Sequence, residues 1–379
     1  MDILVQHTYL IAGGIEKALL NFLNLISKET NVDLFLFNKV GVLKDDIPES
    51  VKVLQANNLM KKRISDIQHS TGTHKQKSNI KQKIKNILKF FGFNKIYNNY
   101  VLNSQKKLEK HYDVSICFNG FVDGCKYVLK KTKASKKIVI FHSDAENVEL
   151  SKQRLKLFGK FDKILCVSES CANVFKQKYP KFSNKVDFLY NPQNNIEIIE
   201  KAQEHKVDYS KNFNIVSVSR LSEEKAYLRT LEVFKKLKEE GFSFVWNIVG
   251  DGDVKPEISE YIEKNQMEKQ VVLVGNKSNP YPYIKAADLF LLASYHEAAP
   301  VVYGESMILG VPVLSTNTRS AKELVGDYGF ICENNSDSIY AELKLILSDK
   351  NLIKDKKEKL KNYTYNNDKI KSKFFDIVR

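Results

Sequence analysis

Cysteine is scarce in this sequence of 379 residues, and the five cysteines are scattered. They form no C-x-x-C pair, and the seven histidines form no H-x-x-x-H pattern, so we expect neither a disulfide framework nor a structural zinc site. No run of eighteen uncharged apolar residues is present, which excludes a membrane-spanning helix. Residues 1–5 lack the basic and apolar regions of a secretory signal. These absences predict a reduced, cytoplasmic protein.

The composition is that of a globular protein, with 43% apolar and 28% charged residues. At about 150 residues per domain, the length predicts two domains, each able to bury its own core. Strand-like segments alternate with helical patterns in both halves, which predicts an α/β fold of two Rossmann-like, doubly wound domains facing a cleft. We expect strands at 3–5, 32–37, 51–54, 114–118, 137–141, 163–167 and 186–190, and then at 214–218, 244–249, 271–274, 288–293 and 311–314.

A change in composition after Pro192 suggests where the domains divide. We expect a first domain at 1–191, a polar, lysine-rich linker at 192–211 and a second domain at 212–362. A helix at 363–379 is expected to pack back on the first domain.

The net charge of +15 is concentrated in residues 61–110, which hold thirteen Lys and Arg against two acidic residues. Within this segment, apolar residues from Ile80 to Phe91 alternate with lysines in a helical pattern. Such a helix lies on anionic membrane surfaces, and we favour this reading. The alternatives are packing on the first domain or, less favoured, binding of single-stranded nucleic acid through nearby aromatic residues.

The segment 294–307 follows an expected strand and opens a helix near Pro300, a residue favoured at the first helical position. A helix N-terminus offers free N–H groups to an anion. Glu297 and Glu305 are eight residues apart, a rise of about 12 Å if helical. That spacing suits a sugar at one end of a nucleotide diphosphate and the ribose at the other. Two solvated glutamates on a surface helix would give the same pattern.

Three further sets lie at the carboxyl ends of expected strands, where ligands bind in such sheets. Arg220 and Lys225 are five residues apart in a loop and can both reach one diphosphate. Gly13 and Gly14 would let the backbone approach a ligand closely, although a tight turn is the simpler reading. His142 directly follows a strand and would hydrogen-bond a donor sugar or an attacking hydroxyl, or serve only the structure.

Together these residues resemble a retaining glycosyltransferase of family 4 with the two-domain GT-B fold, of the bacterial surface-polysaccharide type. The resemblance spans nearly the whole chain and is strongest over 214–333. Glu297 and Glu305 match the E-x7-E motif of that family, and Arg220 and Lys225 match its diphosphate-binding pair. Similar proteins also carry like residues at Gly250-Asp251-Gly252, Ala287-Asp288, Gly310-Val311-Pro312, 320–323, Val167-Ser168 and 190–192.

The resemblance implies a role for each matching position. Glu305 would hold the ribose hydroxyls, and Glu297 and His142 would lie near the reacting sugar. The diphosphate and the remaining parts of the donor would be bound by Arg220, Lys225, Gly13, Gly14, the backbone at Ala298, Ala299, Pro300 and Val301, and, around the base, Asn276.

Two positions depart from the family pattern: Ala226 and Ala298-Ala299 stand where glycine is common, which leaves donor choice open. Asp251-Gly252-Asp253 spells a D-x-D string that binds metal in glycosyltransferases of the other main fold. We interpret it here as a loop, because Arg220 and Lys225 already supply the positive charge.

The resemblance implies transfer of a sugar, with retention, from a nucleotide-diphosphate sugar, with UDP favoured, to a lipid-linked or oligosaccharide acceptor. We expect a metal-independent enzyme without cofactors, at the inner face of the cell membrane, working in capsule, exopolysaccharide or O-antigen synthesis. No nucleic acid partner is expected. Two alternatives stay open: another GT-B enzyme such as a sugar phosphorylase, or a non-catalytic basic lipid- or nucleic-acid-binding protein.

Overall fold

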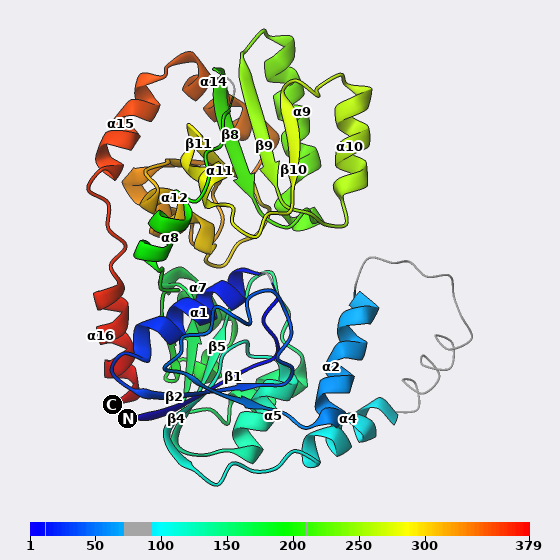
Figure 1. Cartoon of the computed structure of the whole chain (residues 1–379), viewed down its shortest axis with the longest axis vertical. Helices are drawn as coiled ribbons and strands as arrows, with labels where there is room; N and C mark the ends of the chain where they lie inside the picture. The colour runs from blue at the N-terminus through cyan, green and yellow to red at the C-terminus, as the bar shows by residue number, and fades with distance from the viewer. Residues whose placement is uncertain (12, 72–92, 210) are drawn as a thin grey trace.

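The first domain is built on a parallel sheet of seven strands in the order β3-β2-β1-β4-β5-β6-β7 (Figure 1). This computed structural model describes residues 1–11, 13–71, 93–209 and 211–379. The strands are β1 (Asp2–His7), β2 (Asn31–Leu36), β3 (Lys52–Gln55), β4 (His111–Cys117), β5 (Lys133–Phe141), β6 (Lys163–Cys166) and β7 (Val186–Phe188). Apolar side chains fill β1 on both faces because helices cover the sheet on both sides.

Helices connect these strands and bury one face each. They are α1 (Gly14–Ile26), α2 (Asn58–Thr71), α4 (Phe93–Asn103), α5 (Val122–Lys131), α6 (Lys152–Phe158) and α7 (Glu169–Lys178), with a 3-10 turn η1 (Pro180–Phe182). In α1, Leu19, Phe22 and Ile26 recur at helical spacing and are buried in the core. None of the helices that the structure describes is long and apolar enough to cross a membrane.

The second domain has a parallel sheet of six strands in the order β10-β9-β8-β11-β12-β13. These strands are β8 (Phe213–Val218), β9 (Phe244–Val249), β10 (Val271–Gly275), β11 (Leu289–Leu292), β12 (Val313–Thr316) and β13 (Phe330–Cys332). Its helical segments are α8 (Asn195–Lys201), η2 (Glu223–Lys225), α9 (Tyr227–Glu239), α10 (Lys255–Lys264), α11 (Tyr281–Lys285), α12 (Val301–Ile308), α13 (Ala321–Val325), η3 (Gly326–Tyr328), α14 (Ser336–Ser348) and α15 (Asn351–Leu360).

The last helix, α16 (Asn367–Val378), returns to the first domain and lies beside α1 (Figure 1). Its Phe374 is fully buried and meets the ring of Phe22 edge-on, with ring centroids 5.0 Å apart. Ile370, Ile377 and Val378 join the same core cluster. The chain therefore crosses between the two domains twice, once before α8 and once before α16.

The predicted fold class is confirmed: both domains are parallel α/β sheets, and all twelve expected strands are present with ends shifted by a few residues. β13 was not expected, because its three residues lie between Gly329 and Glu333 and form no longer apolar run. The basic amphipathic segment around residues 80–91 lies outside the described residues. The part of 61–110 that is described includes α2 and α4, which project from the first domain (Figure 1).

Substituting Phe374 tests how much α16 contributes to the first domain. We expect Phe374→Ala to lower the free energy of unfolding by about 3–5 kcal/mol, because it removes a fully buried ring from the core. Phe375→Ala, at the adjacent half-buried position, is the matched control and should cost less than half as much. Urea unfolding followed by circular dichroism reports the whole chain, whereas the only tryptophan, Trp246, reports the second domain. Equal effects of the two substitutions would contradict this account.

Candidate functional site

Glu297 and Lys225 form an ion pair at the carboxyl edge of the second sheet. Lys225 ends the turn η2 after β8, and Glu297 follows the neighbouring strand β11, so both loops leave the sheet at the same edge. Lys225 Nζ lies 2.5 Å from Glu297 Oε1, and the Ser294 hydroxyl donates to the same oxygen at 2.8 Å. The two charged side chains are only 16% and 11% exposed, and pairing offsets the cost of burying them. Two predicted motifs thus share one site.

The other two predicted donor residues of this edge, Arg220 and Asn276, face solvent. The Arg220 side chain is 75% exposed and pairs with Glu224 at 3.4 Å. Asn276 is exposed in the loop that directly follows β10. Among the described residues, neither contacts Glu297 or Glu305. The Arg220 guanidinium is therefore accessible from solvent.

The D-x-D string packs against the loop that carries Arg220. Leu221 N donates to Asp251 O at 2.9 Å, and Val254 N donates to Leu221 O at 3.1 Å. A Cβ added at Gly252 would lie 2.2 Å from the carbonyl oxygen of Leu221, so only glycine allows this approach. The Asp251 carboxylate accepts from Gly252 N and pairs with Lys255. The string therefore supports the Arg220 loop. Within the described ranges, no group of three or more His, Cys, Asp or Glu could hold a metal ion.

Ala226, one of the two departures from the family pattern, has a left-handed backbone with φ of 55° and ψ of 34°. For a residue with a Cβ this conformation costs roughly 1–2 kcal/mol, a cost that glycine avoids. Ala226 is the residue before α9, and its carbonyl oxygen accepts from Thr230 N and from the Thr230 hydroxyl. The strained turn therefore sits directly after Lys225.

Glu305 is the most buried acidic residue of the site, at 1% exposure. Its Oε1 accepts from Lys17 Nζ of the first domain at 2.9 Å and from the Tyr281 hydroxyl at 3.1 Å. Burial and the Glu305 carboxylate raise the pKa of Tyr281 well above its usual value, so the phenol keeps its proton and donates. Glu305 Oε2 is buried, and none of the described residues makes a hydrogen bond to it. A buried carboxylate oxygen in this state has unused capacity to accept from a ligand.

The helix that carries Glu305 begins later than the sequence suggested. Pro300 is extended, with φ of −65° and ψ of 124°, and α12 begins at Val301. Residues 297–300 are therefore not helical. The predicted rise of about 12 Å assumed a continuous helix from Glu297 to Glu305, and that assumption was wrong. Pro300 also has no amide hydrogen, so the backbone donors of this loop are Ala298, Ala299 and Val301.

The glycine pair of the first domain lies against this loop. Gly13 precedes α1, and a Cβ there would lie 2.4 Å from Glu16 Oε2. A Cβ at Gly14 would make only an ordinary contact, at 3.7 Å, with Val301 of the second domain. A Cβ at Gly13 would therefore displace the end of the Glu16 side chain, whereas Gly14 marks where the two domains meet.

His142 lies at the carboxyl end of β5, as expected, but its Nε2 is enclosed and has no hydrogen-bond partner in the part of the chain that the structure describes. Its ring packs on Phe118 with centroids 4.8 Å apart. Burial, with a smaller contribution from His7, lowers the pKa of His142 to about 3. The imidazole is therefore neutral at pH 7 and offers a nitrogen lone pair rather than a charge.

Several contacts between the domains were missed by the sequence analysis. The Glu323 carboxylate accepts from Glu169 N at 2.8 Å and Ser170 N at 3.0 Å, at the N-terminus of α7. Arg319 pairs with Asp144 at 3.2 Å and also with Glu146. Like Lys17 with Glu305, these partners are far apart in sequence, and no local pattern links them. They hold the two carboxyl edges together.

The low pKa of His142 predicts a pH dependence of stability. Between pH 6.5 and about 3 the unfolded chain binds a proton at this position that the folded chain does not. The free energy of unfolding should therefore fall as the pH falls, by up to about 1.4 kcal/mol per pH unit from this residue. Urea unfolding at pH 7 and pH 4.5 measures this fall in the free energy of unfolding. The fall should be smaller in His142→Gln than in wild type. In His205→Gln, at an exposed histidine, it should equal that of wild type. The same fall in His142→Gln and wild type would contradict the assignment.

Comparison with known proteins agrees with this architecture. Residues 198–367 match the family described as Glycosyl transferases group 1. The chain is 32% identical over 219 residues to the N-acetylgalactosamine-N,N'-diacetylbacillosaminyl-diphospho-undecaprenol 4-alpha-N-acetylgalactosaminyltransferase of Campylobacter jejuni, covering 57% of this chain and 59% of that protein. It is 22% identical over 225 residues to the amylovoran biosynthesis glycosyltransferase AmsD of Erwinia amylovora, covering 58% and 63%. The chain thus spans about three fifths of the length of these two relatives.

Solved structures are similar over nearly the entire chain. A TarM mutant of S. aureus, solved with UDP and other ligands, superposes with a TM-score of 0.71 at 15% identity, over 100% of this chain and 99% of that one. Anabaena HepE in complex with UDP gives 0.68 at 16% identity, over 99% of both chains. At these identities the likeness shows the fold. The chain therefore has the GT-B fold, and residues 198–367 match the model of the glycosyl transferases group 1 family.

Proposed function

We propose that this chain is a glycosyltransferase that moves a sugar from a nucleotide-diphosphate sugar, with a UDP-sugar favoured, to a lipid-linked saccharide in the synthesis of a bacterial surface polysaccharide. The family match supports the reaction class. The name of the Campylobacter jejuni relative describes a lipid-diphosphate-linked acceptor, and AmsD acts in amylovoran biosynthesis. Structures of similar fold hold UDP.

The observation that carries the proposal is the unpartnered Oε2 of Glu305, enclosed where the carboxyl edges of the two sheets meet. A carboxylate accepts hydrogen bonds only, so the ligand must bring donors, and the ribose diol of a nucleotide does so. Lys17 and Tyr281 already hold Oε1. The ribose would take Oε2 and compete with Lys17 for the other oxygen.

The diphosphate would bind near Lys225 and Arg220. Lys225 now neutralises Glu297, and Arg220 is exposed next to it in the same loop. A diphosphate would attract both cations. When Lys225 pairs with the diphosphate, Glu297 Oε1 becomes free to accept hydrogen bonds from sugar hydroxyls. Amides at the start of α12 would supply further donors to the sugar.

We propose front-face substitution with retention. The bond between the anomeric carbon and the phosphate oxygen breaks, and the acceptor oxygen bonds to the same face of that carbon. The acceptor proton passes to the departing phosphate oxygen, and the nucleoside diphosphate leaves. Arg220 and Lys225 would stabilise its growing charge without a metal ion. His142, neutral and half-buried, would accept a hydrogen bond from the sugar at Nε2.

We also propose that the protein works as a peripheral protein at the inner face of the cell membrane. The described part of 61–110 supports this: on α4, Ile96 and Tyr100 are 66% and 63% exposed, in a strongly basic segment. Apolar side chains among lysines suit an anionic lipid surface.

Vesicle flotation tests this proposal. The double variant Ile96→Ser/Tyr100→Ser should bind phosphatidylglycerol vesicles less than wild type does. Leu345→Ser, at an exposed apolar position on α14, should bind them as wild type does.

A sugar-transfer assay with Lys225→Ala tests the proposed function. Using a panel of UDP-sugars and a lipid-diphosphate-linked saccharide, we expect wild type to transfer one sugar in the presence of a chelator, with the donor's anomeric configuration kept in the product. Lys225→Ala should lower kcat/KM about 100- to 1,000-fold, because it removes charge stabilisation of the leaving diphosphate. Lys235→Ala, on the outer part of α9, should leave it unchanged.

Three results would redirect the proposal. An inverted product would exclude the retaining mechanism. Phosphate-dependent breakdown of a glucan would favour a phosphorylase. Binding to vesicles or oligonucleotides without any transfer would favour a non-catalytic protein.

A further inference from the structure

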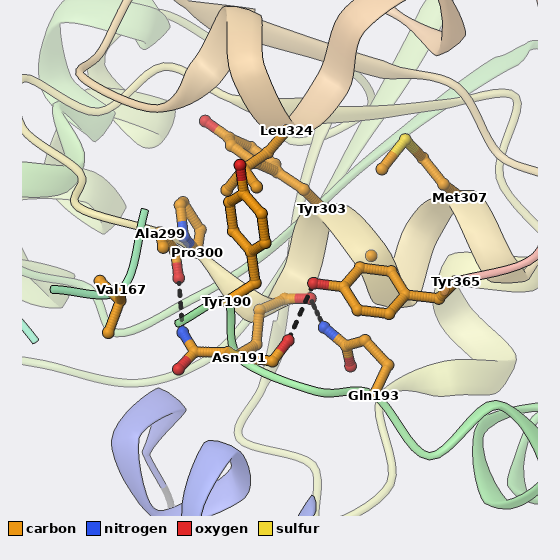
Figure 2. A pocket seen from close by; sticks show the side chains of 12 residues that line it. Val167, Tyr190, Asn191, Gln193, Ala299, Pro300, Tyr303, Met307, Leu324 and Tyr365 are labelled. Atoms are coloured by element: carbon orange, nitrogen blue, oxygen red, sulfur yellow. Dashed lines mark hydrogen bonds between the residues drawn. The ribbon is translucent and has the colours of Figure 1, made fainter. Parts of the chain in front are cut away.

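The segment between β7 and α8 carries two amide side chains that hold the sugar-binding loop. This segment, residues 189–194, is the first crossing between the domains. Asn191 Nδ2 donates to Ala299 O at 3.2 Å, and Gln193 Nε2 donates to Val301 O at 2.8 Å. The two bonds flank Pro300, as Figure 2 shows. The crossing segment thus fixes the backbone on both sides of the turn into α12.

The fit of Gln193 against α12 depends on a glycine. A Cβ at Gly304 would lie 2.7 Å from Gln193 Nε2 and 3.1 Å from its Cγ and Cδ. Gly304 is one residue before Glu305, in the middle of α12, where glycine is otherwise unfavourable by about 1 kcal/mol. Its presence allows the side chain of Gln193, which is 4% exposed, to lie directly on the helix.

The second crossing between the domains is tied to the same residues. Asn367 Oδ1 accepts from Gln193 N at 3.1 Å, and Asn367 Nδ2 donates to Gln193 O at 2.7 Å. The Tyr365 hydroxyl donates to Asn191 O at 2.8 Å (Figure 2). Both crossings and the loop before α12 therefore form one hydrogen-bonded unit.

A cavity among these side chains has a volume of about 10 Å³, close to that of a single water position. It is lined by Tyr190, Asn191, Gln193, Pro300, Tyr365 and neighbouring residues (Figure 2). That volume is far below what a sugar needs. The amides of Asn191 and Gln193 therefore serve the loop and not a ligand of their own.

We infer that Gln193 and Asn191 are positioning residues: from the interdomain crossing they set the geometry of the loop 298–301 that would bind the transferred sugar. The inference rests on the proposed function. Because the loop's carbonyls are fixed to the crossing segment, movement of one domain against the other would move the sugar subsite. The ribose contact of Glu305 lies further along α12 and has its own partners, Lys17 and Tyr281. Loss of Gln193 should therefore affect the sugar more than the nucleotide.

Calorimetry and kinetics with UDP and the accepted UDP-sugar test the inference. In Gln193→Met, which keeps length but cannot donate, we expect the Kd for UDP to stay within about 2-fold. The kcat/KM for the UDP-sugar should fall at least 10-fold. Gln193→Leu, which likewise cannot donate, should behave alike. Gln203→Met, at an exposed position, is the matched control and should leave both unchanged.

Asn191→Asp, at a half-buried position, is a second variant to test if the Gln193 variants fail to fold. Its kcat/KM for the UDP-sugar should fall while its Kd for UDP stays close to that of wild type. The inference is overturned if all folded variants keep wild-type kcat/KM, or if affinity for UDP falls as much as kcat/KM. Failure of the proposed function is distinct: wild type itself would then neither bind UDP nor transfer a sugar.

Discussion

A buried carboxylate organises the meeting of the two domains. Glu305 is almost wholly enclosed in α12, and a charge in that position must be compensated. Part of the compensation comes from Tyr281 in its own domain, but the cation comes from Lys17, 288 residues away in the first domain. The same carboxylate therefore both draws the domains together and keeps one oxygen unsatisfied. In our account the donor's ribose would compete with Lys17 for this carboxylate.

Further contacts between the domains hold the stretch of chain that leads into α12. The Ser168 hydroxyl and the Cys171 thiol both donate to Ala298 O at 3.4 Å. Val301 is part of the first domain's core cluster. On this view residues 297–305 belong to the second domain by sequence and are held by contacts from both domains. A site of this kind depends on the domain arrangement, which is what a reaction joining two substrates requires.

Much of the fold could be predicted because its signals are local. Apolar runs such as 244–249 and the helical spacing of Leu19, Phe22 and Ile26 are set by burial within a parallel sheet and its covering helices. β13 was missed because its three residues form no longer apolar run. The start of α12 was placed one residue early because proline suits both the residue before a helix and its first position.

The site was predictable only in part, for a physical reason. Glu297, Glu305 and Lys225 stand out by spacing and by family resemblance, and the structure brings Glu297 and Lys225 into contact. Lys17, Tyr281 and Gln193 give no such signal, since each acts through a partner distant in sequence. The exposure of Arg220 and the enclosure of His142 Nε2 likewise depend on packing that spacing does not encode.

The most direct test of the account is whether Glu305 recognises a ribose hydroxyl. Calorimetric titration of wild type with UDP and with 2′-deoxy-UDP should give a Kd ratio of about 10 or more, since a buried hydrogen bond to a charged group contributes about 1.5–3 kcal/mol. In Glu305→Gln the ratio should fall toward 1, while Glu333→Gln, at an exposed position, should keep the wild-type ratio. An unchanged ratio in Glu305→Gln, or no binding of UDP, GDP or ADP by wild type, would contradict the central claim.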